Sequence, residues 1–143
     1  MERVLDQTLI TYPETYVRDI SGEQIKLILE DVCDNLFNPD PFYQQGGDMV
    51  RVGGMNYVCE PQATAGKRIS EMTLDDGTPI HASRNYKVAG WGTVNSKAPG
   101  PPIWDIVAEY LKDRKSTRID RLNTPILKGV GSNPGLADYD GST

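Results

Sequence analysis

Residues 37–61, FNPDPFYQQGGDMVRVGGMNYVCEP, decide how this chain folds. The prolines at positions 39 and 41 exclude a helix and favour extended backbone in the residues before them. Further on, the run Met55–Cys59 alternates in the way that is typical of a half-buried strand. The stretch therefore predicts an extended loop that leads into a strand whose inner face is apolar.

Two glycine pairs, Gly46-Gly47 and Gly53-Gly54, lie on either side of Arg51. Glycine permits a positive φ or a close approach of the backbone to another group, and inside a strand it predicts a bulge. A guanidinium with so little side-chain cover suits an anion or a peptide backbone. The alternative is a loop and a bulged strand in which Arg51 is a solvated charge at the edge. Residues near Arg51 that have hydrogen-bonding side chains are Gln44, Gln45 and Asp48.

Helix and strand patterns alternate along the rest of the chain. One apolar stripe runs from Ile25 to Leu36 with helical spacing, and a second begins at Ile103 after two prolines. Strands are predicted at residues 8–12, 15–20, 68–74 and 86–94, with a tight turn at 75–77. This order predicts an α+β domain with a mixed or antiparallel sheet and two main helices. We expect residues 1–115 to form this domain and residues 116–143 to be an irregular C-terminal extension.

Composition excludes several classes of function. The chain has 143 residues, enough for one domain, and its net charge of -5 and isoelectric point of about 4.8 argue against a nucleic-acid partner. No apolar run approaches the roughly 20 residues of a membrane span, and we expect no signal peptide in the residues that follow Met1.

Catalytic groups and metal ligands are not expected in this chain. Its single histidine, His81, cannot build a metal site, and no activated nucleophile accompanies it. Cys33 and Cys59 are interpreted either as one disulfide in an oxidising compartment or as two small buried side chains. Arg18 and Arg68 are expected to be solvated strand charges.

A resemblance to a known family rests on three segments, residues 38–54, 90–95 and 98–105. They resemble the SoxB thiosulfohydrolases of bacterial sulfur oxidation, which are similar to the five-prime nucleotidases. The resemblance covers the chain but only the C-terminal domain of those enzymes, so the chain is expected to be N-terminally truncated. It implies helices and sheets layered as in that domain, and a separate N-terminal domain that holds two manganese ions. It also implies a periplasmic location and no hydrolase activity for this chain alone.

The resemblance further implies a substrate, a cysteine S-thiosulfonate on the flexible C-terminal arm of a carrier protein. Arg51 would meet the terminal sulfonate, and Trp91 is a second candidate that is otherwise interpreted as a core aromatic. The residues expected to shape the groove around the arm are Gln45, Gly46, Gly47 and Asp48.

Two alternatives remain open from the sequence. The first is the C-terminal domain of a five-prime nucleotidase or related phosphoesterase. Nucleotidases carry a Gly-Gly-Asp-Gly turn late in the domain, beside an aromatic ring that stacks on the base, and residues 95–102 lack it. The second is a non-enzymatic module that binds an extended peptide at the edge of its sheet.

Overall fold

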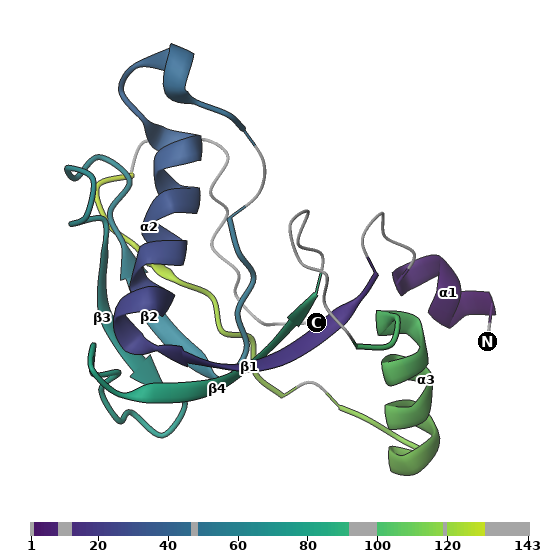
Figure 1. Cartoon of the computed structure of the whole chain (residues 1–143). Coiled ribbons are helices and arrows are strands. Elements are labelled where there is room, and N and C mark those ends of the chain that lie inside the picture. Colours follow the sequence, from purple (N-terminus) through teal and green to yellow (C-terminus); the bar gives the residue numbers. More distant parts are fainter. Residues whose placement is uncertain (1, 9–12, 47–48, 92–99, 119, 131–143) are drawn as a thin grey trace. The chain divides into compact units, whose positions relative to one another are not determined.

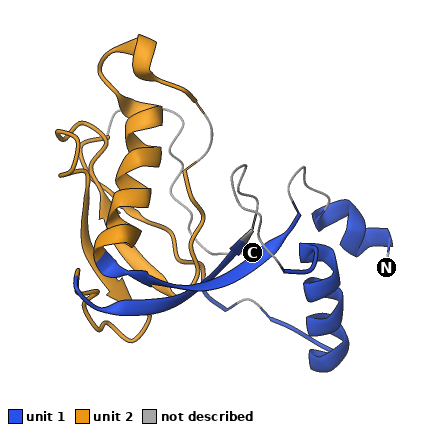
Figure 2. Cartoon of the chain, in the orientation of Figure 1, with its two compact units in different colours: residues 1–22, 83–121 blue, residues 23–82, 122–143 orange. Residues whose placement is uncertain are grey.

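The computed structural model describes residues 2–8, 13–46, 49–91, 100–118 and 120–130 (Figure 1). Its elements in chain order are α1 (Glu2–Thr8), β1 (Thr15–Ser21), α2 (Gly22–Phe37), the short 3-10 helix η1 (Pro41–Tyr43), β2 (Met55–Cys59), β3 (Ile69–Leu74), β4 (Asn85–Trp91), α3 (Ile103–Arg114) and β5 (Ile126–Leu127). These elements form two compact units, coloured separately in Figure 2. The first comprises Met1–Gly22 and Ser83–Arg121, and the second Glu23–Ala82 and Leu122–Thr143.

The first unit is built on an antiparallel pair of strands, β1 and β4, and two helices. The strands pair along their whole length, from Thr15 opposite Trp91 to Ser21 opposite Asn85. Gly90 faces Tyr16 across the pair, and a Cβ atom there would overlap the outer end of the tyrosine side chain, so a larger residue would require that ring to shift. Helix α3 contacts α1 and buries Ala108.

The second unit packs α2 against a three-stranded sheet of order β3-β2-β5. β2 runs antiparallel to β3 and parallel to β5, with a register shift between Asn56 and Val58. The core joins the apolar stripe of the helix to the inner face of the sheet, because both faces shield apolar surface from water. Its buried residues are Leu29, Cys33, Met55, Tyr57, Cys59 and Ile69.

The predicted α+β fold with two main helices and a mixed sheet is confirmed. The bulge, however, lies inside β2 and not at Gly53-Gly54, because the strand begins only at Met55. Helix α1 was not predicted; Thr8 ends that helix, and the rest of the strand predicted at 8–12 lies outside the described residues. In the C-terminal region the structure adds β5, which pairs with β2.

Candidate functional site

The segment that follows α2 folds back onto the end of that helix. The Asn38 side chain donates to Asp34 Oδ2 at 3.0 Å, and the Gly46 amide donates to the Asn35 carbonyl at 3.3 Å. Between these two anchors, Asp40 caps η1 by accepting from the Phe42 amide at 3.0 Å. The tip of the segment is therefore held by local hydrogen bonds while Phe42 is 95% exposed.

The residues predicted to bind substrate fall on both units. In the second unit Gln45, Gly46 and Arg51 are exposed, and Gly46 has a φ of 76° that favours glycine. Gly47 and Asp48 lie outside the described residues, so their predicted part in a groove stays a prediction. Trp91 ends β4 in the first unit, and its side chain is likewise outside the described part.

Asn123 anchors the glycine pair next to Arg51. Its Oδ1 accepts from the Gly54 amide at 3.1 Å, and its Nδ2 donates to Asn56 at 3.1 Å and to Asp75 at 2.6 Å. Gly54 has a φ of 82°. One side chain from the C-terminal region thus fixes the entry to β2, which the sequence pattern did not indicate.

Arg68 is not the solvated strand charge that was predicted. Its side chain is only 3% exposed, and Nη1 donates to Asp34 Oδ1 at 2.6 Å, while Nε donates to the Ala63 carbonyl at 2.9 Å. A buried guanidinium requires such partners, because an unpaired charge away from water is costly. Arg18, in contrast, is exposed as predicted and lies over the Tyr16 ring.

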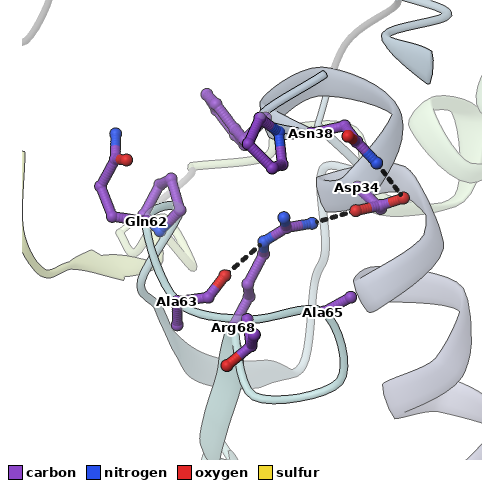
Figure 3. A pocket seen from close by; sticks show the side chains of 10 residues that line it. Asp34, Asn38, Gln62, Ala63, Ala65 and Arg68 are labelled. Atoms are coloured by element: carbon purple, nitrogen blue, oxygen red, sulfur yellow. Dashed lines mark hydrogen bonds and ion pairs between the residues drawn. The ribbon is translucent and has the colours of Figure 1, made fainter. Parts of the chain in front are cut away.

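A pocket of about 370 Å³ opens beside Arg68 (Figure 3). It lies between the end of α2 and the loop that connects β2 to β3. Its lining residues are Asp34, Phe37, Asn38, Pro39, Pro61, Gln62, Ala63, Thr64, Ala65 and Arg68. Phe37 and Pro61 contribute apolar walls, and Asp34 and Arg68 contribute charged groups, so the pocket has both apolar and charged surface.

The electrostatics of this region come from one cation and two carboxyl side chains. Asp34 and Glu30 are one turn apart on α2, and Glu30, which is 6% exposed, accepts from the amides of Gly66 at 2.9 Å and Ile69 at 2.8 Å. The hydrogen bond from Arg68, together with that from Asn38, lowers the pKa of Asp34 below its ordinary value of 3.8. Asp34 is therefore ionised at neutral pH and forms a charged pair with Arg68.

Cys33 and Cys59 are both buried in the core of the second unit, with their sulfur atoms 3.6 Å apart and not bonded. The structure therefore supports the interpretation of two small buried side chains. Burial raises the pKa of Cys33 to about 12 and also raises the pKa of Cys59. Since the thiolate is the reactive form, neither sulfur is set up as a nucleophile.

Metal ligands do not gather within the described ranges, where no group of three or more histidine, cysteine, aspartate or glutamate side chains could hold an ion. Nor is any helix in the described part of the chain both long and apolar enough to cross a bilayer.

Comparison with known proteins identifies the family model for the C-terminal domain of 5'-nucleotidase, which matches residues 6–105. The solved structure of the sulfate thiohydrolase SoxB from Thermus thermophilus, in complex with glycerol, is 37% identical over 85% of this chain, with a TM-score of 0.72. No curated protein matches the chain.

Two further solved structures share the fold at lower identity. A putative 5'-nucleotidase from Staphylococcus aureus, in complex with alpha-ketoglutarate, is 15% identical over 89% of this chain, with a TM-score of 0.64. A 5'-nucleotidase precursor from Thermus thermophilus is 18% identical over 87% of it, with a TM-score of 0.59. The chain spans 24% to 29% of the length of these three proteins.

Proposed function

Because the chain belongs to the 5'-nucleotidase C-terminal domain family, we propose that it is the substrate-recognition domain of a SoxB-type thiosulfohydrolase. The observation that carries the proposal is the 37% identity to SoxB over 85% of the chain. The two nucleotidase structures, at 15% and 18% identity, support the fold alone.

The substrate in this proposal is a cysteine S-thiosulfonate on the C-terminal arm of a carrier protein in the periplasm. Arg51 is exposed and makes no hydrogen bond or ion pair with the described residues, so its guanidinium is available for a terminal sulfonate. Gln45 and Gly46 lie in the same unit and are exposed as well, which agrees with a role in shaping the path of the arm.

Hydrolysis in this proposal takes place on a separate N-terminal domain that carries two manganese ions. The described residues of this chain offer no cluster that fits a metal, so its own contribution is to bind and orient the arm. Bound manganese would supply an activated water for release of sulfate. The purified chain with added manganese should therefore release no sulfate from a thiosulfonate.

The direct test is binding of a short flexible peptide that carries a cysteine S-thiosulfonate, measured by calorimetry against the same peptide with a free thiol. We expect the modified peptide to bind and Arg51→Gln to weaken it about tenfold, the value of one lost hydrogen bond to a charged group. Arg18→Gln is the control, since Arg18 is also exposed but belongs to the other unit. Equal binding of both peptides would overturn the proposal.

The nucleotidase alternative is tested in the same experiment with a nucleoside monophosphate. Tighter binding of the nucleotide than of the modified peptide would favour that alternative. A preference for the unmodified peptide would favour a peptide-binding module.

A further inference from the structure

We propose that the pocket beside Arg68 is a second binding site, which takes a neutral amide group next to an apolar side chain, as in an extended peptide segment. This site is independent of Arg51, which does not line the pocket. Three features support it: one unpartnered nitrogen, the balance of charge around that nitrogen and the character of the walls.

The nitrogen is Nη2 of Arg68, which points into the pocket in Figure 3. The other two guanidinium nitrogens are engaged by Asp34 and by the Ala63 carbonyl. Nη2 has no hydrogen-bond partner within the described part of the chain. It is not completely buried, because Tyr57 Oη is the one described side-chain atom that is both fully buried and without a partner. The Arg68 side chain is 3% exposed and lines the pocket, so Nη2 is the guanidinium nitrogen that remains to donate to a ligand there.

The charge balance selects a neutral ligand. Arg68 is already paired with Asp34, and Glu30 on the same helix face adds a second carboxyl group. The C-terminal end of α2 adds the negative end of the helix dipole. A phosphate or carboxylate would meet more negative than positive charge here, whereas a carbonyl oxygen needs only the N–H of Nη2.

Asp34 complements that donor with an acceptor. Its side chain is 36% exposed, and each carboxylate oxygen can accept more than the single hydrogen bond that it receives. A peptide group offers both a carbonyl oxygen and an N–H, so it can accept from Arg68 and donate to Asp34 at once. This pairing is the reason for choosing an amide over a ketone or an ester.

The walls suit an apolar flank on the ligand. Phe37, Pro39 and Pro61 line the pocket with rings, and Ala63 and Ala65 leave room between them. The volume of about 370 Å³ lies at the lower end of the range of small-ligand pockets, roughly 300–1,000 Å³. It accommodates one or two residues of a peptide.

The test is titration of the chain with N-acetyl-leucinamide, followed by backbone amide chemical shifts. We expect saturable shifts at Ala63, Ala65 and Asn38, with a dissociation constant in about the millimolar range for so small a probe. Acetate and inorganic phosphate are the charged comparisons, and neither should produce these shifts. Binding of either anion in preference to the amide, or no binding of the amide, would overturn the proposal.

Two variants separate the polar contact from the shape of the pocket. Arg68→Lys keeps a cation beside Asp34 but removes Nη2, and should weaken the probe about tenfold. Ala65→Leu fills the pocket from an exposed position and leaves the pair of Arg68 and Asp34 in place, so it should also weaken the probe. If Arg68→Lys fails to fold, Ala65→Leu alone decides; unchanged binding in the folded variants would overturn the site.

Arg51→Gln is the control that keeps this site apart from the one proposed for the thiosulfonate. It should leave binding of N-acetyl-leucinamide unchanged, and Ala65→Leu should leave binding of the thiosulfonate peptide unchanged. Each proposal can then fail without the other.

Discussion

Arg51 and Arg68 belong to the same unit but lie in opposite environments. Arg51 is exposed between two glycine pairs, whereas the Arg68 side chain is buried and holds a carboxylate and a carbonyl. A solvated arginine can be lost with little change in stability, but a buried one supports the groups that pair with it. The first is therefore free to serve a ligand, and the second serves the fold and keeps one nitrogen for a ligand.

The largest expected effect comes from removing the buried arginine. Arg68→Met should lower the free energy of unfolding by about 2–3 kcal/mol, because Asp34 loses its cation and the Ala63 carbonyl loses its donor. Arg51→Met, the matched control, should change it by less than about 0.5 kcal/mol. Urea denaturation of both variants measures the difference. Equal effects would mean that the contrast between the two arginines does not hold in solution.

A smaller loss of stability is expected at Asn123, which anchors the segment next to Arg51. Asn123→Ala removes one acceptor and two donor contacts, to Gly54, Asn56 and Asp75, and should cost about 1–2 kcal/mol. Faster hydrogen exchange at the Gly54 amide should accompany it. Thr124→Ala, at the exposed neighbouring position, is the control. Unchanged exchange at Gly54 would show that Asn123 does not hold this segment.

The sequence predicted those helices and strands that have a periodic pattern of apolar residues within their own length. The apolar stripe of α2 and the alternation of β2 each indicate a buried side, and residues from both meet in the core as expected. The match is partial, because Ile28 of the stripe is 48% exposed and Val58, on the other face of β2, is also buried. Strand β5 has two residues, too few for any period to be detected, and it forms because β2 offers an unpaired edge. Its existence depends on a partner far away in the sequence.

The candidate site was only partly accessible from the sequence for the same reason. In the sequence, Arg18 and Arg68 both look like solvated strand charges, because a single arginine in a predicted strand does not indicate whether its side chain is buried or exposed. What separates them is Asp34, which comes from α2, and the Ala63 carbonyl, which comes from the loop before β3. The four-residue spacing of Asp34, on α2, and Asn38, just after it, can be read from the sequence, but the loop that these two residues face cannot.

The pair of Arg68 and Asp34 also predicts how stability responds to acid. Because the folded state lowers the pKa of Asp34 below 3.8, the unfolded chain binds its proton first as the pH falls. The contribution is complete above about pH 4 to 5 and is lost below that as the folded carboxyl titrates. Asp34→Asn should therefore flatten the acid limb of a stability profile measured between about pH 2 and 6, the range in which carboxyl groups titrate.

Asp31→Asn is the control for that experiment, since Asp31 is an exposed carboxylate on the same helix. An acid limb that is as steep in Asp34→Asn as in the parent chain would show that the pair with Arg68 does not form in solution.

The smallest effect is expected at Tyr57, whose unpartnered hydroxyl does not line the pocket beside Arg68. The Tyr57 hydroxyl is buried and has no hydrogen-bond partner among the described residues, and burial raises its pKa to about 12. Tyr57→Phe removes an unsatisfied group and should leave stability unchanged or raise it by up to about 1 kcal/mol in urea denaturation, with exposed Tyr110→Phe as control. A loss of stability above that value would mean that the hydroxyl has a partner. Nη2 of Arg68 also lacks a partner in the described part of the chain, but it opens to a pocket, so only Nη2 is in a position to gain one from a ligand.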